Sequence, residues 1–119
     1  MSLLLGLALA VALDPDCKRA DLTQAEMNDC ALITLGEADT RLNRQWKRTI
    51  ERFRTNRSNE DAERLRLAQR AWVAFRDAEC DAEWPWDLGV SLDKFQNIYC
   101  RIELTDARTE RLTELMREN

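Results

Sequence analysis

The sequence predicts an all-α protein: an up-down-up three-helix bundle with a long first helix and two disulfides at one end. Apolar residues recur at helical spacing in three segments, and no segment alternates with the period of two expected of strands. Glycine and proline, which interrupt helices, account for only 3 and 2 of the 119 residues. Short connections between the helices favour antiparallel neighbours.

The first helix has a clear start signal. Thr23 as N-cap and Glu26 three residues later form a capping box. Gly36 is expected to mark a close contact with another helix. We expect one helix of roughly 30 residues, ending in the polar run 55–59. Its apolar stripe consists of Met27, Ala31, Leu35, Ala38, Leu42, Trp46, Ile50 and Phe53.

Two further helices follow. Ser58 or Asn59 is the expected cap of the second, and Ser91 of the third, with Pro85 and Gly89 breaking the chain between them. The second stripe is predicted to reach Cys80 through Ala62, Leu65, Ala68, Trp72 and Phe75. The third is predicted to contain Leu92, Phe95, Tyr99, Ile102, Thr105, Thr109, Leu112 and Met116.

An uncharged apolar leader, Leu3 to Leu13, precedes these helices. It has the length of a signal-peptide core and is shorter than the roughly 20 residues that span a bilayer. Residues 8–10 and 10–12 both fit an A-x-A cleavage pattern, although no basic segment precedes the leader. We expect residues 1–12 to be a signal peptide and residues 13–119 a single exported domain. The alternative is an N-terminal helix of the domain.

Four cysteines in an exported chain indicate disulfides. Their spacing lacks the close pairs of a four-cysteine zinc site. An antiparallel bundle places all four at one end. Of the three possible pairings we expect Cys17–Cys30 and Cys80–Cys100, because each closes a short local loop.

Composition excludes several classes of function. The chain has no histidine, so it has no Ser-His-Asp or Cys-His catalysis and no histidine metal ligand. The carboxylate spacing does not match an EF-hand loop, and a compact bundle offers no obvious sugar cleft for paired carboxylates. A net charge of −4 argues against nucleic-acid binding. We therefore expect a non-enzymatic binding protein without cofactor or metal.

The candidate partner-binding segment lies at the end of the second helix. Carboxylates there oppose the helix dipole and repel one another, and segments that break local rules are often functional. The alternative is structural: nearby cations neutralise the acids, the tryptophans plug the bundle, and a half-buried Arg76 pairs with a carboxylate. The candidates are Arg76, Asp77, Glu79, Asp81, Glu83, Trp84, Trp86 and Asp87. The neutralising cations would be Lys18, Arg19, Lys94 and Arg101.

A basic region occupies the hairpin between the first and second helices. It contains one acid, Glu51, and is either a solvated helix face or a binding surface for acidic wall polymers or envelope proteins. Its cations are Arg41, Arg44, Lys47, Arg48, Arg52, Arg54 and Arg57.

The run from Leu67 to Cys80, LAQRAWVAFRDAEC, resembles the signature of the LprI-like lysozyme inhibitor domain family. Residues 23–30, followed by Ala-Asp at 38–39 and Leu-Asn at 42–43, resemble the opening of that family. Residues 100–112 fit its closing C-x4-T-x2-R-x3-L pattern. The resemblance covers nearly the whole mature chain and all four cysteines. It departs between the second and third helices, where only Gly89 stands in place of a Gly-Gly-Ser-like stretch.

The resemblance implies an exported bacterial domain, some of whose relatives are associated with lysozyme inhibition. The expected function is a periplasmic protein that inhibits a cationic lysozyme by protein–protein contact. Either the acidic segment meets the positive surface of the enzyme, or Arg76 or another cation pairs with the carboxylates of its cleft. Residues 14–16 (Asp-Pro-Asp) do not look like a lipobox before Cys17, so we expect a soluble form. The alternative is an envelope scaffold that binds through the basic hairpin. Exposed apolar residues on the second helix, such as Leu67 and Val73, would indicate a protein partner or a homodimer.

Overall fold

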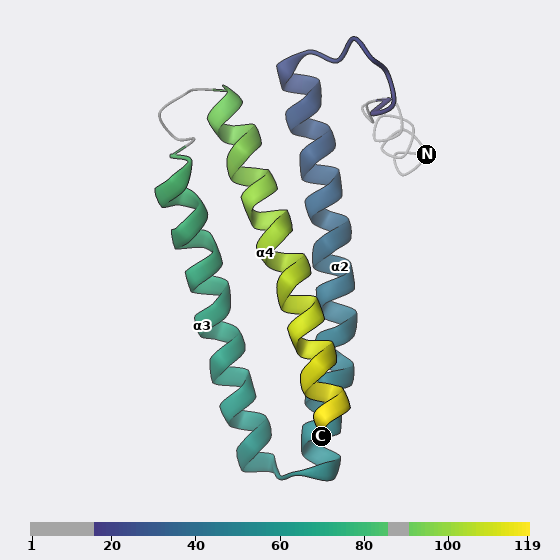
Figure 1. The fold of residues 1–119 in the computed structure, drawn as a ribbon, viewed down its shortest axis with the longest axis vertical. Coiled ribbons are helices and arrows are strands. Elements are labelled where there is room, and N and C mark those ends of the chain that lie inside the picture. Colours follow the sequence, from purple (N-terminus) through teal and green to yellow (C-terminus); the bar gives the residue numbers. More distant parts are fainter. Residues whose placement is uncertain (1–15, 86–90) are drawn as a thin grey trace, which may run out of the picture.

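A computed structural model describes residues 16–85 and 91–119 and contains three helices. They are α2 (Gln24–Asn56), α3 (Asn59–Glu83) and α4 (Ser91–Glu118), and they run alternately down and up the molecule (Figure 1). The predicted three-helix bundle is confirmed, and the described ranges contain no strand. The expected signal peptide lies outside the described residues.

α2 spans 33 residues, and its start follows the predicted capping box. The Thr23 hydroxyl accepts a hydrogen bond from the Glu26 backbone N–H at 3.1 Å, and the Glu26 carboxylate accepts one from the Thr23 N–H, also at 3.1 Å. The predicted apolar stripe of this helix is buried or half-buried throughout. The close contact expected at Gly36 is wrong, because an added Cβ would meet no atom within 4 Å.

Ser58 is the N-cap of α3 and accepts a hydrogen bond from the Asp61 N–H at 3.0 Å. The helix ends where the Trp84 N–H donates to the Cys80 oxygen at 2.9 Å. Ser91 was the expected N-cap of the third helix. This prediction is off by one residue, because Ser91 is already the first helical residue of α4.

The core lies mainly between α2 and α4, which pack most extensively against each other. One cluster joins all three helices and is formed by Leu42, Ile50, Phe53, Ala62, Leu65 and Leu112, with Trp46, Trp72 and Leu115 packed against it. A second cluster nearer the cysteines joins only α2 and α4 through Ala31, Ile98 and Ile102. α3 lies along one side of this pair (Figure 1).

The predicted stripes of α3 and α4 are partly wrong. Ala68 and Phe75 of α3 are exposed, because the buried positions of this helix are confined to its first two turns and to Cys80. On α4, Leu92 and Tyr99 are exposed, and Asn97 and Ile98 are buried in their place. The apolar pattern therefore placed both helices correctly and predicted most of their buried positions, but it also included apolar residues that face solvent.

Both expected disulfides are present. Cys17 bonds Cys30 and Cys80 bonds Cys100, each with a Cα–Cα distance of 5.7 Å. The bonds lie at the end of the bundle where α2 and α4 begin and α3 ends, as antiparallel packing requires. Among the described residues, no helix is long and apolar enough to cross a membrane.

Candidate functional site

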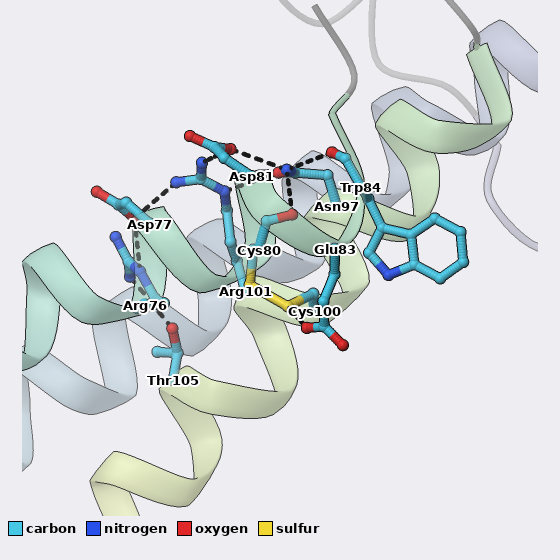
Figure 2. Close-up of a disulfide and its surroundings, with 10 residues drawn as sticks. All are labelled: Arg76, Asp77, Cys80, Asp81, Glu83, Trp84, Asn97, Cys100, Arg101 and Thr105. Atoms are coloured by element: carbon cyan, nitrogen blue, oxygen red, sulfur yellow. Dashed lines mark hydrogen bonds and ion pairs between the residues drawn. A yellow bond between two sulfur atoms is a disulfide. The ribbon is translucent and has the colours of Figure 1, made fainter.

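The candidate segment closes α3 beside the Cys80–Cys100 disulfide (Figure 2). We call it the acidic end of α3; its described members are Asp77, Glu79, Asp81, Glu83 and Trp84. The structure brings Arg76 and these five residues together on the last two turns of the helix and its cap. Trp86 and Asp87, which the sequence also predicted here, lie outside the described residues.

Arg101 of α4 neutralises two of the acids. Its guanidinium donates to the Asp77 carboxylate at 2.6 Å and to the Asp81 carboxylate at 2.8 Å. Its side chain is only 19% exposed, so these ion pairs are partly shielded from water. Of the cations expected to neutralise this end, Arg101 does so, whereas Arg19 pairs with Asp21 and Glu26 at the start of α2.

Asn97 joins the same network from within the bundle. It is 2% exposed, and its amide nitrogen lies 3.1 Å from the Cys80 oxygen, 3.0 Å from the Trp84 oxygen and 2.9 Å from the Asp81 carboxylate. Its own side-chain oxygen accepts from Arg101 at 2.8 Å. The last carbonyls of a helix lack intrahelical partners, and here a side chain of α4 reaches the Trp84 oxygen and adds a second donor to the Cys80 oxygen, which also accepts from the Trp84 N–H.

Sequence reasoning missed Asn97. The available signal was its spacing of four residues from Arg101, which places the two side chains on one face of α4. The predicted stripe passes through Phe95 and Tyr99 instead, and it therefore omits the pair that meets the end of α3.

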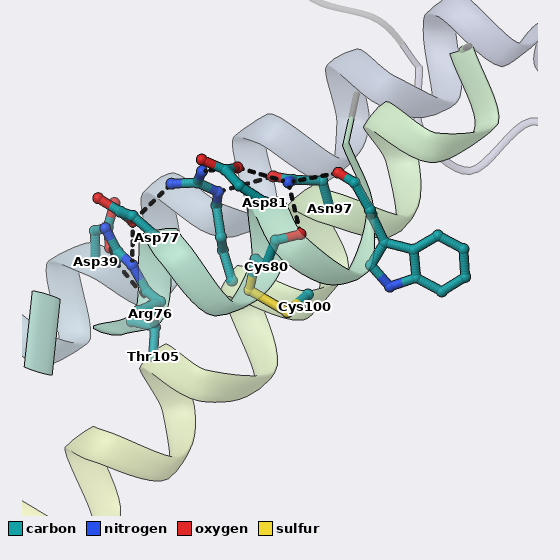
Figure 3. A network of polar contacts seen from close by, with 10 residues as sticks. Asp39, Arg76, Asp77, Cys80, Asp81, Asn97, Cys100 and Thr105 are labelled. Carbon is teal, nitrogen blue, oxygen red and sulfur yellow. Dashed lines mark hydrogen bonds and ion pairs between the residues drawn. A yellow bond between two sulfur atoms is a disulfide. The ribbon is translucent and has the colours of Figure 1, made fainter. Parts of the chain in front are cut away.

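Arg76 faces inward rather than toward solvent (Figure 3). Its side chain is 14% exposed and contacts the Asp77 carboxylate at 3.0 Å, the Asp39 carboxylate at 3.4 Å and the Thr105 hydroxyl at 3.2 Å. The guanidinium also lies over the Trp72 ring at 5.4 Å. These contacts link α3 to both other helices and match the structural alternative for this residue.

Three members of the acidic end are exposed, and none of them is held by an ion pair with a described residue, although the Glu83 carboxylate lies 3.4 Å from Cys100 Sγ. Glu79 and Glu83 are exposed and form no ion pair with any described residue. The Trp84 side chain is 36% exposed, and its indole points away from the Arg101 network (Figure 2). The surface thus offers two carboxylates and one aromatic ring on a backbone fixed by the disulfide and by Asn97.

The cations of the basic region fall into two groups, those that form ion pairs and those that do not. Arg41, Arg54 and Arg57 form ion pairs with acids of the bundle. The other four cations occupy one exposed face of α2 and form no ion pair within the described ranges; they are Arg44, Lys47, Arg48 and Arg52. Arg48 borders two surface hollows of about 440 and 420 Å³.

Trp72 has a second cationic neighbour, Arg108 of α4, whose guanidinium lies 6.0 Å from its ring and donates to the Gln69 amide oxygen at 2.8 Å. Partial burial, together with the nearby charge of Arg111, lowers the pKa of Arg108. Among the described residues, no group of three acids or cysteines is placed to hold a metal ion.

Comparison with known proteins agrees with the resemblance seen in the sequence. The model of the family "Lysozyme inhibitor LprI" matches residues 16–112. The uncharacterized protein R02472 of Rhizobium meliloti (strain 1021) is 32% identical over 112 residues, which cover 87% of this chain and 80% of that protein. No solved structure gives a significant match. With a family match over most of its length, this chain belongs to the LprI lysozyme inhibitor family.

Proposed function

We propose that this protein is an exported inhibitor of a cationic lysozyme and acts by protein–protein contact through the acidic end of α3. Family membership supports the activity, and the exposed set Glu79, Glu83 and Trp84 supports this location. The two disulfides are consistent with an oxidising compartment such as the periplasm. The family description concerns inhibition rather than catalysis, and we propose no enzymatic activity.

Opposite charges would bring the two proteins together. Lysozymes of the animal type carry a strong positive charge, so unpaired carboxylates would steer the encounter. Trp84 would supply the apolar anchor, because partly exposed aromatic residues contribute much of the binding energy at interfaces. Asp77 and Asp81 would act indirectly, since Arg101 already holds them.

A pose that inserts Arg76 into the carboxylate-lined cleft of the enzyme receives less support. Its guanidinium would first have to leave Asp39, Asp77 and Thr105. We therefore propose that Arg76 holds α3 in position while the residues beyond it make the contact.

The test is the lytic activity of a cationic animal-type lysozyme on peptidoglycan, titrated with the oxidised protein at low and physiological salt. We expect stoichiometric inhibition that weakens as salt rises. No inhibition at a large molar excess would contradict the proposal.

Paired variants then locate the contact. Glu79→Gln with Glu83→Gln should weaken inhibition and flatten its salt dependence, and Trp84→Ala should weaken it further. The matched control is Glu103→Gln with Glu110→Gln, which makes the same change in net charge at exposed positions of α4. Equal effects of the two double variants would contradict a contact through the acidic end.

One observation favours a second candidate function, an envelope scaffold that binds an acidic polymer or protein through the basic region. Four of its cations lack an acidic partner among the described residues. Charge reversal at Arg44, Arg48 and Arg52, with the acidic end intact, should then abolish capture of a periplasmic partner in a pull-down. Retention of every partner would exclude this candidate.

A further inference from the structure

We propose that the outer face of α2 binds peptidoglycan, the glycan that lysozyme cleaves, through the carboxylates of its peptide stems. This role rests on the proposed inhibition of lysozyme, and it gives the basic region a ligand of defined chemistry. The centre of the face is a row of three arginines spaced four residues apart. We call it the arginine row; its members are Arg44, Arg48 and Arg52.

The arginine row lacks acids that would neutralise it. Residues four apart follow one another along a helix at intervals of about 6 Å. No acid stands three or four residues from Arg44 or Arg52, and neither forms an ion pair with a described residue. By contrast, the exposed Arg57 and Arg111 each pair with an acid in the next turn. Like charges at this spacing repel, so an anionic ligand would relieve an unfavourable arrangement.

One acid, Glu51, lies among these cations and is already engaged. Its carboxylate lies 3.5 Å from the Arg54 guanidinium and also 3.5 Å from the Thr55 hydroxyl. Residues 44–54 contain five cations and this one acid, so their net charge is +4. The preceding acid of α2 on this face, Glu37, is seven residues before the row and therefore about 10 Å away along the helix.

The acids of α4 do not neutralise the row either. Asp106 pairs with Arg41 at 2.9 Å. Glu110 and Glu114 line a separate hollow with Arg117, and no residue of α2 lines that hollow. The positive charge of the arginine row is therefore available to an external anion.

Two surface hollows follow one another along the row. Both border Arg48, and together they extend from residue 40 to residue 56, about 24 Å of helix. The first, of about 440 Å³, is lined by Thr40, Asn43, Arg44, Lys47 and Arg48. The second, of about 420 Å³, is lined by Arg48, Glu51, Arg52, Thr55, Asn56 and Met116. A guanidinium binds a carboxylate through two parallel hydrogen bonds, and hydroxyl and amide side chains suit the polar groups of a glycan.

The composition of this face favours a glycan over other anionic partners. Every exposed residue between positions 40 and 55 is polar or charged. Protein interfaces and membrane-surface helices place apolar or aromatic anchors beside their cations, and single-stranded nucleic acids are held by aromatic stacking. The exposed apolar residues Leu67, Val73 and Phe75 lie on α3 instead. A hydrophilic polymer with carboxylates along its length needs only the groups that the α2 face presents.

The two proposed contacts lie at opposite ends of the bundle. The arginine row occupies the half of α2 away from the disulfides, whereas the acidic end of α3 lies beside Cys80–Cys100 (Figure 1). One molecule can therefore hold the glycan and a lysozyme at the same time. Attachment to the substrate raises the local concentration of the inhibitor where the enzyme works.

Co-sedimentation with purified peptidoglycan sacculi, in the absence of lysozyme, tests the contact. We expect the oxidised protein to pellet with the sacculi at low salt and to be released as salt rises. Replacing all three arginines of the row (Arg44→Gln, Arg48→Gln, Arg52→Gln) should weaken binding by about tenfold.

The matched control makes the same change in charge on α3, with Arg64→Gln, Arg66→Gln and Arg70→Gln. This variant should pellet like the wild type, and circular dichroism checks that both triple variants are folded. Equal effects of the two triple variants would overturn the proposal, as would a wild-type protein that does not pellet at low salt.

Modified sacculi test the chemistry of the ligand. Coupling methylamine to their carboxylates removes the negative charge and should abolish pelleting, and chitin, an uncharged glycan, should not bind. Removal of phosphodiester-linked polymers with hydrofluoric acid should leave binding unchanged. Undiminished binding to the amidated sacculi would overturn carboxylate recognition. Loss of binding after the acid treatment would overturn it as well and assign the row to a phosphate polymer.

A soluble substrate separates this contact from the inhibition of lysozyme. With a neutral chitooligosaccharide as substrate, the wild type and the triple variant of the arginine row should inhibit equally, because the acidic end is intact in both. Inhibition by a wild-type protein that does not pellet would overturn the glycan contact alone. Pelleting without inhibition would contradict the lysozyme contact and leave the glycan contact supported. Capture of a periplasmic protein through the row, without binding to sacculi, would overturn the glycan as its ligand.

Discussion

The amide nitrogen of Asn97 lies 3.1 Å from the main-chain oxygen of Cys80, so α4 caps the end of α3 by a buried side chain. The same nitrogen also reaches the Trp84 oxygen at 3.0 Å. Together with the Cys80–Cys100 disulfide, this contact gives the acidic end two independent attachments to α4. A binding surface held in one conformation loses less conformational entropy when a partner docks.

Replacement of Asn97 should therefore destabilise the fold. Asn97→Ala removes the donor to the Trp84 oxygen, one of two donors to the Cys80 oxygen and the acceptor of Arg101, and should lower the free energy of unfolding by about 2 kcal/mol. Urea denaturation followed by circular dichroism measures this change. Gln96→Ala, at the preceding residue, is the control, because its side chain contacts neither carbonyl. Losses of the same size in both variants would contradict a capping role for Asn97.

Arg101 should matter more for stability than an ordinary surface arginine. Arg101→Gln removes the cation shared by Asp77 and Asp81 and should cost about 1–2 kcal/mol, because the guanidinium is largely shielded from water. The comparison is Arg111→Gln, which breaks an exposed pair with Glu114 and should cost under about 1 kcal/mol. Thermal or urea unfolding of both variants checks this order, and a smaller loss for Arg101→Gln would refute it.

Gly36 offers a gain in stability. It lies inside α2 with open space around the position of a Cβ, so Gly36→Ala should stabilise the protein by about 1 kcal/mol through helix propensity alone. Gly36→Ser should give a smaller gain, because serine is a weaker helix former. Unfolding curves of the three proteins test the series. A loss of stability in the alanine variant would indicate a contact at this position.

The capping box should make stability depend on pH. Hydrogen bonds from the backbone and side chain of Thr23, together with the charge of Arg19, lower the pKa of Glu26 below its ordinary value of 4.5. A carboxyl group with a lowered pKa in the folded state stabilises the protein fully above its ordinary pKa, and this contribution is lost as the pH falls through the lowered value. Glu26→Gln should thus be less stable than the wild type at neutral pH, and the difference should shrink below pH 4.5.

Urea unfolding across that pH range provides the measurement. Glu37→Gln is the control, because Glu37 is exposed and forms no ion pair with a described residue. A difference between wild type and Glu26→Gln that stays constant with pH would show that the box does not depend on the charge of Glu26.

The sequence by itself determined the three helices and most of their ends, because caps and apolar spacing act within one or two turns. It also predicted the disulfide pairing, because each bond closes a short local loop, whereas antiparallel packing by itself placed all four cysteines at one end and left three pairings open. The sequence also indicated the family, because the LprI signature lies within one continuous segment, residues 67–80.

Only the tertiary structure decided which of the apolar residues of α3 and α4 are buried and which charges remain without an ion pair among the described residues. α3 carries apolar residues on both sides, so the pattern that included Phe75 could not reveal that α2 and α4 pack against the opposite face. The same holds for the acidic end, where Arg101 pairs with Asp77 and Asp81 and leaves Glu79 without an ion pair among the described residues. Local spacing fixes secondary structure, whereas burial and ion pairing depend on neighbours that are distant along the chain.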